Sequence, residues 1–101
     1  MKPLERLKKL NTKENLWIYI LSLLSLKERY GYEIPNLIQE KFKFKPGKIT
    51  PYRVLYRLEK ENLVQSTFKE RKRIYKITKE GKKLLKQAKE FYENLLKYVF
   101  N

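Results

Sequence analysis

Cysteine, histidine and aspartate are absent from this sequence of 101 residues, and all eleven acidic residues are glutamates. Without histidine and cysteine, the chain has no Ser-His-Asp triad and no thiolate nucleophile. The same absences remove the usual ligand sets of zinc and every possible disulfide, so nothing indicates an oxidising compartment. These gaps predict a protein that is not an enzyme and that holds no metal ion and no cofactor.

Glycine is scarce, and long apolar runs are missing. The three glycines, Gly31, Gly47 and Gly81, are isolated, which excludes a glycine-rich loop around a phosphate. The longest apolar stretch covers residues 16–26, whereas a membrane-spanning helix needs about 20 residues. No apolar run directly follows the basic start of the chain, as a signal peptide would require. We therefore expect a cytoplasmic protein without a membrane partner.

Basic residues dominate the charged ones. The 25 lysines and arginines against 11 glutamates give a formal charge of +14. This excess predicts a polyanionic partner, but charge alone does not distinguish DNA, RNA and a lipid surface. The length suits one domain with a modest core.

Helical periodicity predicts the first half of the chain. Residues 1–11 carry leucines at a spacing of three, which fits either a frayed terminus or a short amphipathic helix. The next helix, capped by Asn11 or Thr12, is apolar on most sides from Leu16 onward and is predicted to lie at the centre of the fold. Apolar residues at helical spacing predict a second helix over residues 32–42.

A third helix is predicted over about residues 50–61. Thr50 supplies a hydroxyl cap, and Pro51 suits the first helical position. An apolar stripe on this helix is expected to be buried, which leaves tyrosines and arginines on its other faces. Asn62 is a suitable stop because asparagine tolerates the left-handed conformation.

The period changes to two after this helix. Residues 64–68 and 74–77 alternate and are rich in β-branched and aromatic side chains, which predicts a hairpin. Residues 70–73 are expected to form its charged tip, with no glycine or asparagine to define the turn.

A last, long helix is predicted from Thr78 to about residue 100. Its apolar residues step by three and four, the spacing of a heptad seam, and the helix would project beyond the core. The same helix of a second copy is the simplest cover, so we expect a homodimer. The predicted interface residues are Trp17, Leu85, Ala88, Phe91, Tyr92, Leu95, Leu96 and Val99.

The order of these elements predicts an α+β protein that is mainly α. It is a winged helix-turn-helix with a two-stranded wing and a long C-terminal dimerisation helix. The expected DNA-binding domain covers residues 1–78, and the dimerisation helix covers residues 79–101. A helix in the major groove buries one side and offers polar, cationic and aromatic groups on the other. The residues expected at base edges are Tyr52, Arg53 and Tyr56. Those expected at the DNA backbone are Tyr32, Lys48, Thr50, Arg57, Lys69, Arg71, Lys72 and Arg73.

Three segments resemble the PadR family of winged-helix transcriptional regulators. They are GYEI at 31–34, YRLEKENLV at 56–64 and RIYKITKEG at 73–81, and they occur in the family's order. The resemblance implies a homodimeric DNA-binding repressor whose first and C-terminal helices build the dimer. The resemblance also allows a small-molecule effector that binds in a pocket at the dimer interface, but nothing else in the sequence supports one. Trp17, Tyr19, Phe91 and Tyr92 could line this pocket, but simple packing explains these residues equally well.

Two other functions compete with a sequence-specific regulator. The charge is spread along the whole chain, which also fits a non-specific or architectural nucleic-acid-binding protein. An RNA-binding accessory factor is a weaker alternative, because no aromatic stacking sheet is predicted.

Overall fold

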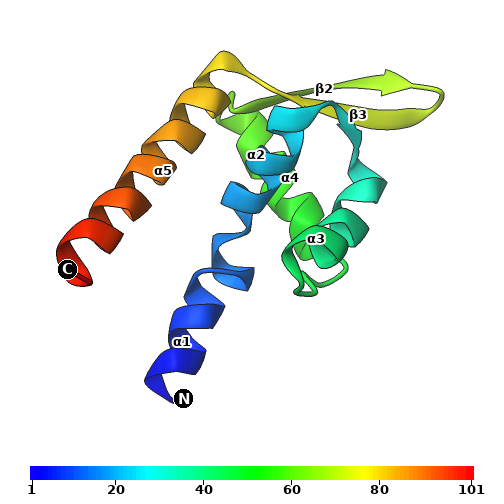
Figure 1. Cartoon of the computed structure of the whole chain (residues 1–101). Helices are drawn as coiled ribbons and strands as arrows, with labels where there is room; N and C mark the ends of the chain where they lie inside the picture. Colours follow the sequence, from blue (N-terminus) through cyan, green and yellow to red (C-terminus); the bar gives the residue numbers. More distant parts are fainter.

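A small antiparallel sheet and four helices enclose the core, and a fifth helix extends from the N-terminus (Figure 1). The computed structural model describes all 101 residues. The elements, with η for short 3-10 turns, are α1 (Pro3–Leu10), η1 (Lys13–Asn15), α2 (Leu16–Leu26), β1 (Arg29–Tyr30), η2 (Gly31–Glu33), α3 (Ile34–Phe42), α4 (Thr50–Lys60), β2 (Val64–Lys69), β3 (Lys72–Ile77) and α5 (Lys79–Val99).

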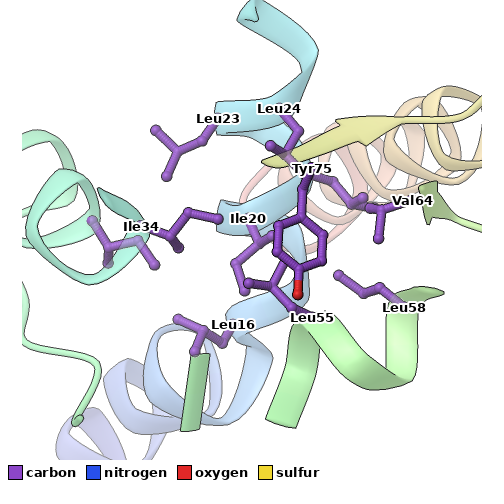
Figure 2. Packing of buried hydrophobic residues seen from close by; sticks show 11 residues of the cluster. Leu16, Ile20, Leu23, Leu24, Ile34, Leu55, Leu58, Val64 and Tyr75 are labelled. Carbon is purple, nitrogen blue, oxygen red and sulfur yellow. The ribbon is translucent and has the colours of Figure 1, made fainter. Parts of the chain in front are cut away.

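Helix α2 forms the centre of the core, as its apolar sequence predicts. Its five buried residues are Leu16, Ile20, Leu21, Leu23 and Leu24. Side chains from α3, α4 and the sheet close around them, and Figure 2 shows Ile34, Leu55 and Tyr75 among these partners. Burial of such apolar side chains is the main force that stabilises the fold.

The hairpin is confirmed, but its tip is narrower than predicted. Only Glu70 and Arg71 form the turn, with φ of 53° and 64°. Lys72 and Arg73 belong to β3, where Lys72 pairs with Lys69 and Arg73 pairs with Phe68. Prediction of a four-residue tip was wrong because neither turn residue is one that usually adopts positive φ.

A third strand completes the sheet, in the order β1-β3-β2. Strand β1 is only two residues long and pairs Tyr30 with Ile74. It was not predicted, because two residues carry no periodicity. The chain then enters α3 through η2, so the predicted helix over 32–42 begins as a 3-10 turn.

Two predicted helix caps are wrong. Thr50 is the first residue of α4 rather than its cap, which is Ile49 without a side-chain hydrogen bond. Asn11 and Thr12 instead donate to the carbonyl oxygens of Leu7 and Lys8. They therefore close α1, whose last carbonyls have no partner within the helix.

Two other terminal signals are confirmed. Asn62 has φ of 63° and ends α4 in the left-handed conformation. The Thr78 hydroxyl accepts a hydrogen bond from the Gly81 amide at the start of α5. The same hydroxyl donates to the carbonyl oxygen of Asn62, so the end of α4 and the start of α5 are held together.

Helix α1 and the C-terminal part of α5 extend beyond the core as two arms, away from the hairpin (Figure 1). Residues 1–11 contain a helix, as one of the two predictions had it, but α1 buries none of its residues. Tyr92 of α5 donates to Asn11 and accepts from Asn15, which ties the second half of α5 to the chain just before α2. None of the helices is long and apolar enough to cross a membrane.

Candidate nucleic-acid interface

Helix α4 has one buried side and one cationic, aromatic side. Pro51, Leu55 and Leu58 are buried against the core. On the outside, Tyr52 is 45% exposed and Tyr56 is 66% exposed. Between and beyond them the outer side carries Arg53, Arg57 and Lys60, which line an open hollow of about 540 Å³ together with the two tyrosines.

The start of α4 and the chain just before it add further donors. Lys48 is exposed just before the helix, and Thr50 is exposed as its first residue. Pro51 has no amide hydrogen, and the amides of Tyr52 and Arg53 donate to the carbonyl oxygen of Ile49. The helix dipole still places partial positive charge at this end of α4. This end of the helix therefore favours an anion such as a phosphate.

Gly31 packs close to the ring of Tyr75 and near the ring of Tyr52. A Cβ atom added to Gly31 would lie 3.1 Å from the Tyr75 ring and 3.7 Å from the Tyr52 ring. Glycine at this position lets η2 approach the sheet and α4 together. Burial, and then the nearby charge of Glu59, raise the pKa of the Tyr75 hydroxyl above its ordinary value.

The wing is the hairpin of β2 and β3. It carries four exposed cations, on Lys69, Arg71, Lys72 and Arg73. The Lys72 ammonium lies 4.9 Å from the centre of the Tyr32 ring. Tyr32, which is 54% exposed, also stacks on Tyr30 with ring centres 5.6 Å apart. The structure thus brings two predicted backbone-contact residues together, one from η2 and one from β3.

A hydrogen-bonded chain joins the wing to α4. The hydroxyl of Ser66 donates to Glu59 over 2.6 Å, and Arg73 donates to the same hydroxyl over 2.7 Å. The Arg73 guanidinium also lies 4.3 Å from the centre of the Phe68 ring. Arg73 is therefore fixed in place, unlike a free surface cation.

Sequence reasoning missed Glu59, Ser66 and Phe68. The sequence shows Glu59 only within the YRLEKENLV segment, and Ser66 and Phe68 only as part of an alternating strand. The pairing of Phe68 with Arg73 follows from the register of the hairpin. That register can be derived from the sequence only if the turn is taken to have two residues, Glu70 and Arg71.

These positive charges are scarcely compensated. The one ion pair of the structure joins Lys9 and Glu14 over 3.6 Å, remote in sequence from α4 and the wing. The net charge of +14 therefore acts on any approaching polyanion.

The predicted interface residues of the long helix fall into two groups. Leu85, Ala88 and Tyr92 are half-buried and line a groove of about 480 Å³ beside α2. The exposed group continues along α5 and consists of Phe91 at 63%, Leu95 at 40%, Leu96 at 63% and Val99 at 61%. Trp17 is half-buried and lines a separate cleft of about 410 Å³ that also includes Arg53 and Arg57.

Packing accounts for two of the aromatics that were considered for an effector pocket. Tyr19 meets Phe42 and Phe44 edge to face, with ring centres 4.9 Å apart in both pairs. Its hydroxyl donates to the carbonyl oxygen of Asn11. Burial, and secondarily Tyr92, raise the pKa of Tyr19. Tyr92 is held by the two asparagines described above.

Similar solved structures are transcriptional regulators. A regulator from Clostridium thermocellum is 36% identical, with a TM-score of 0.77 over 83% of this chain and 88% of that one. A PadR family regulator from Clostridium difficile is 31% identical, with a TM-score of 0.70 over 84% of this chain and 97% of that one. PadR of Bacillus subtilis, solved in complex with operator DNA, is 29% identical, with a TM-score of 0.62 over 72% of this chain and 45% of that one. No curated protein matches the chain.

Residues 20–87 match the transcriptional regulator PadR-like family. This segment runs from the core of α2 through α4 and the wing into α5, so it includes the interface described above. The resemblance predicted from the three short motifs is thereby confirmed. The chain belongs to the PadR-like family of transcriptional regulators and has its winged-helix fold.

Proposed function

We propose that this protein is a homodimeric repressor that acts in the cytoplasm by occupying a double-stranded DNA operator. One observation carries the proposal. The outer side of α4 offers two tyrosines and two arginines, and the cationic wing is fixed to the same helix through Glu59, Ser66 and Arg73. The operator complex of Bacillus subtilis PadR supports DNA as the partner.

Each element has its own role in this proposal. Tyr52, Arg53 and Tyr56 read base edges in the major groove, where each base pair presents a distinct pattern of donors and acceptors. The flanking groups hold phosphates and fix the register of the protein on the duplex. They are Tyr32, Lys48, Thr50, Arg57, Lys69, Arg71, Lys72 and Arg73.

Residues 1–78 form the DNA-binding unit, and residues 79–101 form the dimerisation helix. The exposed apolar side of α5 and the exposed leucines of α1 support this division, because water-exposed stripes of this kind favour association. A two-fold dimer would place two α4 helices on successive major grooves, about one helical turn of DNA apart.

The test is selection of genomic duplex fragments by the purified protein at two salt concentrations, followed by sequencing. We expect enrichment of an inverted repeat whose half-sites are about one helical turn apart. A reporter gene placed behind the enriched site should be expressed less when the protein is present. Higher reporter expression would contradict repression and leave DNA binding intact.

A non-specific nucleic-acid-binding protein is the second candidate. Exposed lysines on α5, far along the chain from α4, favour it: Lys82, Lys83, Lys86, Lys89 and Lys97. Equal binding to every fragment, with affinity collapsing at the higher salt concentration, would support this candidate.

A further inference from the structure

Phe68 is an exposed aromatic residue at the end of a strongly basic hairpin. Its side chain is 68% exposed, and only Lys69 separates it from the turn at Glu70 and Arg71. Apart from its contact with Arg73, most of this large apolar side chain stays in water in the free protein. It suits a partner that offers an apolar surface inside an anionic one.

The register of the hairpin tells which way Phe68 points. Val64 pairs with Ile77 and Ser66 pairs with Tyr75, on the side of the sheet that faces the core and α4. Phe68 and Arg73 form the next pair on this side, because side chains two residues apart lie on the same face of a strand. The pair therefore continues the inner side of the wing beyond the core.

Contacts within the free protein favour one orientation of this pair before any ligand binds. Arg73 contacts the Phe68 ring at 4.3 Å and donates to Ser66, which in turn donates to Glu59 of α4. A ring held in this way loses little conformational freedom when it enters a binding partner.

We propose that Phe68 is an apolar wedge that the wing inserts into the minor groove of DNA, with Arg73 beside it. This inference rests on the proposed function and adds a residue that reads DNA shape. Base faces are apolar and lie between two rows of phosphates, which matches a phenyl ring between cations. Apolar wedges partly unstack a base step and bend the duplex, and they favour steps that deform easily.

The experiment uses the tightest-bound duplex from the selection, cut to about 30 base pairs and labelled at both ends for energy transfer. Phe68→Ala should weaken binding roughly tenfold, the scale of one aromatic–base contact. It should reduce the bend seen by energy transfer. The slope of affinity against salt should stay unchanged, because no charge is lost.

Two further variants and one base analogue sharpen the test. Phe68→Leu should keep most of the affinity and the bend, because leucine also acts as a wedge. Leu26→Ala removes a residue that is 61% exposed at the end of α2, and it should change neither quantity. In the wild-type complex, 2-aminopurine at the inserted step should fluoresce more strongly, and Phe68→Ala should abolish this rise.

The outcomes separate the two proposals. If the wild type binds and bends the selected duplex and Phe68→Ala does the same, the wedge is overturned while the regulator stands. If Phe68→Ala lowers the salt slope, the ring only supports a cation, and the wedge is again overturned. If the wild type selects no duplex at all, the proposed function itself fails. Thermal unfolding of each variant checks that the fold is intact.

Discussion

Gly81, in the first turn of α5, lies against the backbone carbonyl of Leu63. A Cβ atom at this position would approach the Leu63 oxygen far closer than the 3.0 Å that real Cβ atoms respect, and it would lie 2.7 Å from Ile77. The contact is possible only because glycine has no side chain. It fixes the angle at which α5 leaves the wing.

Gly81→Ala should therefore destabilise the protein by roughly 1–3 kcal/mol, since backbone cannot move aside as a flexible side chain can. Alanine is the better helix former by about 1 kcal/mol, so propensity alone predicts the opposite sign. Urea unfolding followed by circular dichroism measures the difference. Lys83→Ala, at an exposed position of the same helix, is the control. A Gly81→Ala protein that is as stable as the wild type would show that α5 can shift freely.

Substitutions in the wing turn should raise the stability of the fold and lower the affinity for DNA. Glu70 and Arg71 both have positive φ, which costs residues with a Cβ on the order of 1 kcal/mol each. Replacing the pair by Glu70→Asn and Arg71→Gly should raise the free energy of unfolding by about 1 kcal/mol. Because the double change removes one negative and one positive charge, its affinity for DNA is compared with that of Glu70→Asn alone, which keeps Arg71. The double variant should bind DNA more weakly than this single variant, and equal affinities would remove Arg71 from the proposed interface.

Two arginines should affect DNA binding in different ways. Arg53→Ala should relax the sequence preference, because the side chain lies on the outer side of α4. Arg71→Ala should weaken binding to all sequences alike and lower the salt slope by about 1. Titration of selected and random duplexes at several salt concentrations measures both effects. Uniform losses in both variants would contradict base reading by α4.

High pH should destabilise the protein through the partly buried Tyr19 and the buried Tyr75. Burial raises the pKa of Tyr19 and of Tyr75, so the native state holds these protons more tightly than the unfolded chain. The stability they contribute is fully present below pH about 10, where the unfolded tyrosines are still protonated, and is lost as the pH rises above it. Tyr19→Phe should flatten this decline in the free energy of unfolding. Tyr98→Phe, at a residue that is 72% exposed, should leave the decline as it is.

The oligomeric state should depend on the second half of α5. Leu96 is 63% exposed, and a glutamate there would place a charge in the proposed dimer interface. We expect Leu96→Glu to shift a dimer toward monomer in sedimentation analysis while circular dichroism stays unchanged. Lys97→Glu, which changes the neighbouring charge, serves as the control. A wild-type protein that sediments as a monomer at high concentration would contradict the proposed dimer.

Periodicity predicted the helices because each buries a continuous stripe that the sequence displays. The all-round apolar character of α2 is the clearest example, since no surface helix would tolerate it. Caps were harder. Thr12 and Thr50 carry the right side chain, but a hydroxyl binds whichever backbone group is free nearby, and for Thr12 that was the end of α1.

Part of the candidate site could be predicted from the sequence, and part could not. Tyr52, Arg53 and Tyr56 follow from helical spacing within one element. The chain of hydrogen bonds from Glu59 through Ser66 to Arg73 depends on how three elements meet, and no local pattern encodes it. Strand β1 escaped notice for the same reason, because it exists only through its pairing with β3.

The scarcity of ion pairs has a consequence for how the protein behaves in solution. With one ion pair and a net charge of +14, the free fold repels itself, and dissolved ions relieve this by screening. Added salt should thus make the unbound protein harder to unfold, while it loosens the complex with DNA. The unbound fold and the proposed DNA complex should therefore depend on salt concentration in opposite directions. At low ionic strength, the phosphates of a bound nucleic acid would neutralise the excess positive charge and so stabilise the folded chain.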